Sequence, residues 1–130
     1  MGIMKNLMIG IHKRTGDRFA GMDLLYITTV GARSGKERVS PVARFRDGDD
    51  AWLVVASNNG AATNPAWYHN LKAHPDQVWI EHGGTRRPAT PHELTGAERE
   101  AALQKIIASQ PRFAGYLKKT SRTLPVIRLT

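Results

Sequence analysis

The chain contains no cysteine, so it forms no disulfide, has no thiolate nucleophile and has no sulfur ligand for zinc. It also lacks any run approaching the roughly 18 apolar residues that a membrane-spanning helix needs. The first residues have neither the uninterrupted apolar centre nor the small-residue cleavage site of a signal peptide. We therefore expect a cytoplasmic protein.

Several motifs of catalysis and nucleotide binding are missing as well. No Gly-x-Ser-x-Gly elbow, His-Glu-x-x-His pair, Gly-Lys-Ser/Thr phosphate loop or Rossmann glycine fingerprint occurs. His69 and His74 lie five residues apart across the expected end of a helix, which does not favour a metal site. Hydrolase, metal and nucleotide-hydrolysis chemistry therefore have little support, and we expect no metal.

Acidic residues are few relative to basic ones: 11 Asp and Glu against 19 Lys and Arg give a formal net charge of +8. Such an excess indicates an anionic partner, either nucleic acid, an acidic membrane surface or a polyanionic small molecule. The alternative is a merely solubilising surface. Nucleic acid ranks last, because the chain has neither a helix-turn-helix nor an aromatic RNA-binding platform. The basic residues fall at 12–18, 33–46, 86–87 and 112–128.

Length and periodicity predict a single domain over residues 1–130. Residues 1–16 form an amphipathic N-terminal helix, which either packs on its own domain or makes weak contact with an anionic membrane. Residues 22–130 form a small α+β barrel of about six mostly antiparallel strands. Asn64 is expected to cap the central helix, and Thr95 with Glu98 to form a capping box for the next. Strands are expected over 24–30, 39–46, 51–57, 78–82, 85–94 and 124–129, and helices over 66–73, 96–109 and after Pro111.

The segment Gly31–Arg38 joins the first two expected strands and combines two glycines, one hydroxyl and three basic side chains. Glycine lets backbone N–H groups approach an anion, and Arg and Lys add charge-assisted hydrogen bonds to phosphate or carboxylate oxygens. The alternative is an ordinary solvated hairpin turn, since turns favour Gly, Ser and Lys in any case. The residue types alone leave these readings about equally weighted.

A second segment combines a small-residue loop after the third strand, Val55–Gly60, with the helix start Asn64–Asn70. Backbone N–H groups at a helix start can hydrogen-bond the carbonyls of a flat heterocycle, and Trp67 can cover its face. The alternative is that Trp67 and Tyr68 are core aromatics that anchor the helix.

Several blocks of the chain, taken together, resemble the deazaflavin-dependent nitroreductase family. These are actinobacterial split β-barrel oxidoreductases that use coenzyme F420, and the resemblance covers roughly residues 5–129. It implies an FMN-binding-type split β-barrel with N-terminal, central and C-terminal helices. The matching blocks are Gly31–Arg38, Ser40-Pro41, Arg46–Gly48, Val54–Asn58 and Asn64–Leu71, of which the last is the most specific.

The resemblance also implies a division of labour among residues. The turn holds the phosphate and the oligoglutamate tail of the coenzyme through Arg33, Ser34, Lys36 and Arg38, with help from the backbone of Ala32. The deazaflavin ring lies against Val39, Ser40, Pro41 and Val42. The remainder of the ring is framed by Val55, Ala56, Ser57, Asn58, Ala66, Trp67 and Tyr68.

Three positions depart from the family pattern. Asn58 stands where members often carry a basic residue, and Gln110 and Phe113 stand where they carry tyrosines. Phe113 cannot donate a proton. The expected proton source is either Tyr116 or water, and Ser57 is the expected group that polarises an acceptor oxygen.

The implied activity is hydride transfer from the reduced deazaflavin to an electron-poor small molecule, either a quinone, an activated enone or a nitro compound. In such an enzyme the protein supplies orientation and electrostatics rather than a nucleophile. The alternatives are an FMN- or haem-binding relative, and a barrel that binds a cofactor or a lipid without turnover. The implied location is the cytoplasm, with peripheral contact at the inner face of the membrane as a further expectation.

Overall fold

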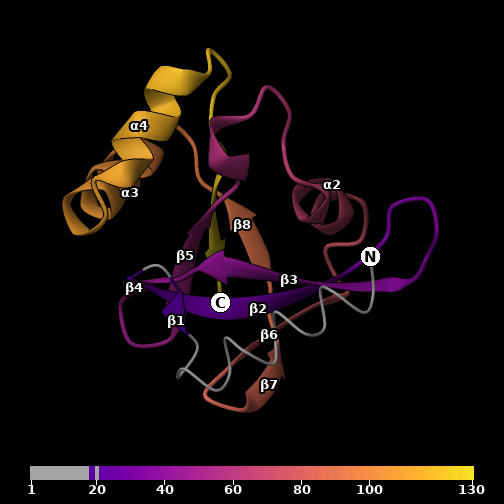
Figure 1. The fold of residues 1–130 in the computed structure, drawn as a ribbon. Helices are drawn as coiled ribbons and strands as arrows, with labels where there is room; N and C mark the ends of the chain where they lie inside the picture. The colour runs from indigo at the N-terminus through magenta and orange to yellow at the C-terminus, as the bar shows by residue number, and fades with distance from the viewer. Residues whose placement is uncertain (1–17, 20) are drawn as a thin grey trace.

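The computed structural model describes residues 18–19 and 21–130, which form two antiparallel sheets and three α-helices (Figure 1). The predicted helix over residues 1–16 lies outside the described residues. Within the described residues, no helix is long and apolar enough to cross a membrane. The elements in chain order are β1 (Arg18–Phe19), β2 (Met22–Val30), β3 (Glu37–Ala43), β4 (Phe45–Asp47), β5 (Ala51–Val55), the 3-10 turn η1 (Asn58–Gly60), α2 (Ala66–Ala73), β6 (Val78–His82), β7 (Thr85–Pro88), β8 (Pro91–Glu93), α3 (Gly96–Ser109), α4 (Arg112–Lys119) and β9 (Val126–Leu129).

The two sheets share no continuous strand. In the first, β2 pairs with β1, β3 and β6, and β6 pairs with β7; the second has the order β4-β5-β9-β8. The longest ladder joins β2 to β3, from the pair Leu24 with Ala43 to the pair Val30 with Glu37. The predicted α+β architecture is confirmed, with nine strands among the described residues instead of about six.

Two predicted strands are divided between the sheets. The strand expected over 39–46 breaks at Arg44, whose guanidinium donates to the carbonyl of Leu24. The strand expected over 85–94 also divides: β7 ends at Pro88 on the first sheet, Ala89 still donates to Val78 of β6 at 2.9 Å, and β8 begins at Pro91 on the second sheet. Thr90 then pairs with Thr130 through two backbone hydrogen bonds of 3.1 Å. At both breaks the chain passes from the first sheet to the second.

The core consists of two apolar clusters, which lie on opposite faces of the second sheet. One cluster lies between the sheets and under α2, and includes Ile27, Val54, Trp67 and Leu71. The other lies under α3 and α4, and includes Leu103, Ile106, Phe113 and Leu124. In Figure 1, α2 and α4 stand on opposite sides of η1, above β3. This arrangement sets the boundaries of the site described below.

Both predicted helix caps are wrong in detail, although α2 and α3 have the predicted bounds. Pro65, with extended backbone, occupies the cap position of α2, and the side chain of Asn64 accepts a hydrogen bond from Arg122 instead. Thr95 is the cap residue of α3 without a side-chain cap bond, and Glu98 accepts from Arg128 at 3.0 Å. In both cases a guanidinium, which makes stronger hydrogen bonds than a neutral N–H, engages the expected partner.

Candidate functional site

A cavity of about 430 Å³ opens between the first sheet, the end of β5 and the first turns of α2 and α4. Its volume lies within the range of small-molecule sites. Its walls are mostly apolar, and its polar groups lie on the loop after β5 and on α4. The lining residues are Met22, Leu24, Pro41, Val42, Ala43, Val55, Ser57, Asn58, Asn59, Pro65, Trp67, Arg112, Phe113 and Tyr116.

The cavity gathers residues from β2, β3, the end of β5 and the loop after it, the start of α2, and α4, but none from the turn. Trp67 is 7% exposed and belongs both to the cavity wall and to the core cluster under α2, so it anchors the helix, and its contact with the ring stays a prediction. Val39, Ser40, Ala56, Ala66 and Tyr68 do not line the cavity. The predicted site residues that do line it are Pro41, Val42, Val55, Ser57, Asn58, Trp67 and Tyr116.

The turn between β2 and β3 is closed by its own backbone. Gly31 donates to Lys36 (2.8 Å), and Gly35 donates back to Gly31 (3.0 Å). A Cβ atom on Gly31 would stand 2.3 Å from the Ser34 hydroxyl oxygen, so a side chain there would displace that hydroxyl. That oxygen accepts a hydrogen bond from the backbone N–H of Lys36 at 3.2 Å, which gives Ser34 a structural role within the turn.

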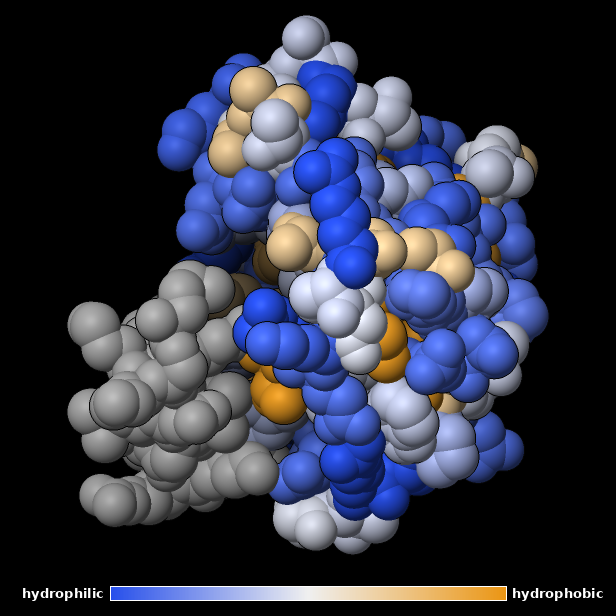
Figure 2. All heavy atoms as spheres, turned by 90° about the vertical axis from the view of Figure 1, so that its right-hand side faces the viewer, coloured by the Kyte–Doolittle hydropathy of each residue, from blue (hydrophilic) through white to orange (hydrophobic). Residues whose placement is uncertain are grey.

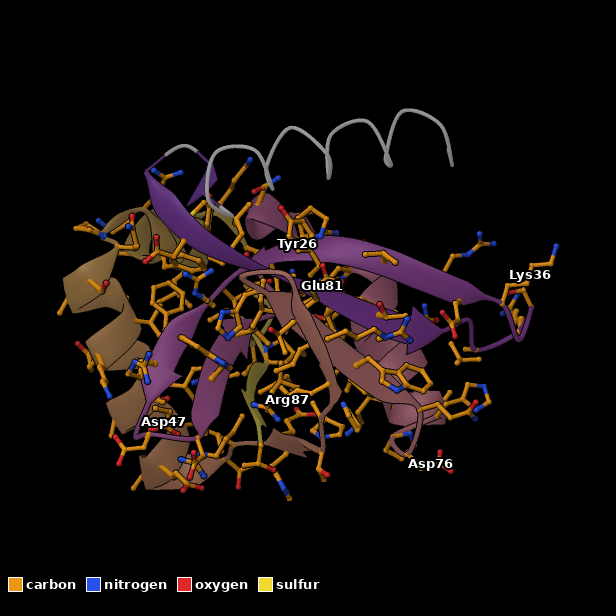
Figure 3. The ribbon with its side chains drawn as sticks, turned by 90° about the horizontal axis from the view of Figure 1, so that it is seen from below. Tyr26, Lys36, Asp47, Asp76, Glu81 and Arg87 are labelled. Atoms are coloured by element: carbon orange, nitrogen blue, oxygen red, sulfur yellow. The ribbon has the colours of Figure 1, made fainter. Side chains whose placement is uncertain are left out.

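The three basic side chains of the turn face solvent. Arg33, Lys36 and Arg38 are exposed, and none of them forms an ion pair with another described residue. Lys36 lies at the tip of the hairpin and points away from the body of the protein (Figure 3). The side of the molecule on which this tip lies is predominantly hydrophilic (Figure 2). Three cations that need no internal partner are available to an anionic ligand.

Asn70, a residue that the sequence prediction did not include in the site, joins the turn to α2. It is 8% exposed, and its side-chain oxygen accepts from the backbone N–H of Ala32 at 3.0 Å. Its amide nitrogen donates to the hydroxyl of Thr29, which is fully buried, at 3.3 Å. The Ala32 N–H, expected to help hold the coenzyme tail, thus has a protein acceptor. One feature of the sequence could have indicated this role: Asn70 is a polar residue three positions after Trp67, on the buried side of the same helix.

The turn and the cavity lie along one strand. Lys36 directly precedes β3, and Pro41 of β3 lines the cavity. At about 3.3 Å per residue, the five steps between them span roughly 17 Å. A ligand with a ring in the cavity and a negatively charged tail of that length reaches the basic turn.

We expect Asn70→Ala to lower the free energy of unfolding by about 1–3 kcal/mol and to weaken the binding of a tailed ligand, since the turn loses its anchor. Thr29→Val is the matched control, because it removes the bond from Asn70 to β2 and keeps the bond to Ala32. Chemical denaturation and ligand titration of both variants separate the two effects. Equal weakening of ligand binding in both variants would show that the bond to the turn has no special role.

Tyr68 has partners outside the cavity. Its hydroxyl donates to Glu93 Oε1 at 2.8 Å, and Lys72 Nζ lies 3.0 Å from the same oxygen. Burial and the hydrogen bond to Glu93 together raise the pKa of Tyr68 to about 12. Burial alone would raise the pKa of Glu93, but the hydrogen bonds from Tyr68 and Lys72 hold it below its ordinary value. Tyr68 is therefore neutral at physiological pH and is hydrogen-bonded away from the cavity, and its predicted contact with the ring stays a prediction.

The α4 wall of the cavity carries one aromatic hydroxyl. Phe113 is 4% exposed and packs edge-to-face on Phe45 and Tyr116, with centroid distances of 5.5 and 5.2 Å. Tyr116 is half-buried, and its hydroxyl makes no hydrogen bond to another residue in the part of the chain that the structure describes. Tyr116 and Ser57 supply the cavity's hydroxyl groups.

Two solved structures share this fold at more than 30% sequence identity. The structure of an F420-H2 dependent reductase is 36% identical, with a TM-score of 0.73, and covers 82% of this chain and 93% of its own. A second structure, described as a domain-swapped dimer, is 32% identical, with a TM-score of 0.74, and covers 98% and 96%. The fold is thus an α+β split-barrel-like fold, as predicted.

Sequence comparison defines the family. The family model described as F420H(2)-dependent quinone reductase matches residues 4–130. An F420H(2)-dependent quinone reductase of Mycobacterium tuberculosis is 36% identical over 126 residues, covering 93% of this chain and 83% of that protein. The chain belongs to the F420H(2)-dependent quinone reductase family. It is an enzyme, and its cofactor is coenzyme F420, which confirms the predicted enzyme class and cofactor.

Proposed function

We propose that this chain reduces quinones, with the coenzyme's ring in the 430 Å³ cavity and its tail on the turn Gly31–Arg38. The observation that supports this most strongly is the Asn70 contact, which fixes the basic turn to the same helix whose first turn forms a cavity wall. The residues present fit the coenzyme, because the flat aromatic face of its ring suits apolar walls made by Pro41, Val42 and Trp67. The bound coenzyme supplies a hydride at carbon 5 of its ring.

The tail site is electrostatic. A phosphodiester followed by glutamates carries several negative charges. The turn offers the cations Arg33, Lys36 and Arg38, none of which is paired with a carboxylate of a described residue. Because these side chains are exposed, their attraction for the tail is screened by salt. Coenzyme affinity therefore falls as ionic strength rises.

The chain's own residues then orient the acceptor and manage its proton. A quinone accepts one hydride from the coenzyme and one proton to become a hydroquinone, so a single proton donor suffices. Tyr116 holds that proton at its hydroxyl, and Ser57 polarises the acceptor oxygen. The apolar side chains of Met22, Leu24 and Phe113 at the cavity favour a hydrophobic acceptor and exclude water from the reacting atoms.

Quinones are the best-supported acceptors, since the family is described by that activity. Reduction of a nitro group requires more protons and repeated two-electron steps, and α4 offers one hydroxyl at the cavity instead of several. Activated enones need one hydride and one proton, as quinones do. We therefore rank the acceptors as quinone, then enone, then nitro compound.

The proposal is tested by titrating the purified protein with oxidised coenzyme F420 and, separately, with FMN, following fluorescence. We expect saturable binding of the deazaflavin and much weaker binding of FMN, whose tail is a single phosphate. Reduced coenzyme is then mixed with a naphthoquinone, a cyclohexenone or a nitroimidazole, and the oxidised ring is followed by absorbance. Preferential binding of FMN would favour the flavin-binding alternative. Binding of the deazaflavin without oxidation by any acceptor would favour a non-catalytic carrier.

A further inference from the structure

Residues 56–64, here called the mouth loop, leave β5 and enter α2, and Ser57, Asn58 and Asn59 of this loop line the cavity. Its backbone is unusual. Asn58 and Asn59 have φ angles of 47° and 55°, in the left-handed region that residues other than glycine rarely adopt. Such a conformation persists only where surrounding contacts hold it.

The loop has hydrogen bonds of its own, from Gly60 to Ser57, from Ala61 to Asn58 and from the Asn58 side chain to Thr63, and one side chain from outside the loop contacts both of its ends. Arg122, from the segment between α4 and β9, donates to the carbonyl oxygens of Ala61 (3.0 Å), Ala56 (3.1 Å) and Ser57 (2.8 Å). The same guanidinium also donates to the side-chain oxygen of Asn64. Four acceptors from both ends of the mouth loop therefore converge on one half-buried arginine.

The adjoining end of α4 packs on the same loop. Lys119 Nζ donates to the carbonyl of Asn59 at 3.2 Å. A Cβ atom on Gly60, whose φ is 78°, would stand 2.9 Å from the Lys119 side chain, so the loop lies directly against α4. Because α4 also carries Phe113 and Tyr116, the loop and the α4 wall of the cavity are held as one unit.

Only arginine has the chemistry for this position. Its planar group presents five N–H donors in a fixed fork, whereas lysine presents a compact point charge on a flexible stem. The backbone N–H of Arg122 donates to the hydroxyl of Thr120 at 3.2 Å, which fixes the direction from which the side chain enters. Arg122 does not line the cavity, so it acts through the mouth loop.

We infer that Arg122 is a positioning residue: it fixes the mouth loop against α4 and thereby sets the affinity of the cavity for the ring of the coenzyme. The inference rests on the proposed function, since it takes the cavity as the ring site. It adds a residue that is about 60 positions away from the loop in sequence and does not line the cavity. Its loss releases four acceptors and lets Asn58 and Asn59 relax out of the left-handed conformation.

The matched control is Arg99, a second half-buried arginine that holds backbone but contacts neither the mouth loop nor the cavity wall. Its Nε and Nη2 donate to the carbonyl of Leu124 at 3.3 and 2.9 Å, and its Nη1 lies 2.6 Å from Glu100. The comparison uses Arg122→Gln, Arg122→Lys and Arg99→Gln. Each is titrated with oxidised coenzyme F420 and with the deazaflavin that lacks phosphate and glutamates. Amide hydrogen exchange is measured over residues 58–63.

We expect Arg122→Gln to weaken binding of both deazaflavins about tenfold and to speed exchange at residues 58–63, with Arg122→Lys intermediate. Arg99→Gln should leave deazaflavin binding and loop exchange unchanged, even if it lowers the melting temperature as much as Arg122→Gln does. Equal ring affinity in Arg122→Gln and wild type, or equal weakening in Arg99→Gln, would overturn the inference. Failure of the wild-type protein to bind either deazaflavin would instead overturn the proposed function, and faster loop exchange in Arg122→Gln would still show that Arg122 holds the mouth loop.

Discussion

Replacing Lys36 and Arg38 together with glutamine is expected to weaken binding of oxidised coenzyme F420 about a hundredfold, as two charge-assisted hydrogen bonds are lost. The melting temperature should change little, because both side chains are exposed and neither forms an ion pair with a described residue. Fluorescence titration and thermal unfolding measure the two quantities on the same samples.

The control for net charge is the double variant Lys105→Gln and Lys118→Gln, which removes the same two positive charges from exposed positions on α3 and α4. It should bind the coenzyme nearly as the wild type does. If both double variants lose affinity equally, the +8 charge acts as a diffuse field, and the turn is not a specific tail site.

Removing the hydroxyl of Tyr116 is expected to lower turnover with a quinone about a hundredfold, in the range typical of a lost general acid. Coenzyme affinity should stay the same, because Tyr116→Phe keeps the ring that packs on Phe113. Stopped-flow oxidation of the reduced coenzyme by a naphthoquinone measures the effect, and the binding titration serves as the internal control.

Ser57→Ala provides the comparison within the same cavity. Polarisation of the acceptor oxygen by Ser57 assists the reaction without supplying the proton, so we expect a smaller loss of turnover than in Tyr116→Phe. Full turnover in Tyr116→Phe would show that solvent delivers the proton. It would leave hydride transfer in the cavity intact, but remove Tyr116 from the mechanism.

Much of the fold followed from local patterns. The helices over 66–73 and 96–109 have the predicted bounds, because proline, glycine and apolar spacing mark them directly. The divisions of the strands at Arg44 and after Pro88 did not follow, since no local pattern at either position marks a change of sheet. Only the partners of each half, one in each sheet, separate them, and those partners lie far away in sequence.

The parts of the site that are formed by contiguous stretches of sequence could be predicted. The basic turn and the helix start were both recognisable as blocks, and Pro41, Val42, Ser57 and Trp67 do converge on one cavity. The residues that hold those blocks in place were not recognisable. Asn70 lies 38 positions from Ala32, and Arg122 lies 65 positions from Ser57, so a local pattern contains neither contact. The expected helix caps failed for the same reason, because distant arginines engage their oxygens.

The most direct test compares two ligands on two proteins: oxidised coenzyme F420 and its ring without the phosphate and glutamates, each titrated into the wild type and into the Lys36→Gln, Arg38→Gln variant. If one molecule spans the turn and the cavity, the wild type prefers the tailed form by about a hundredfold. The variant then loses that preference and keeps its affinity for the bare ring. An unchanged preference in the variant would contradict the account, because the tail would then be bound elsewhere.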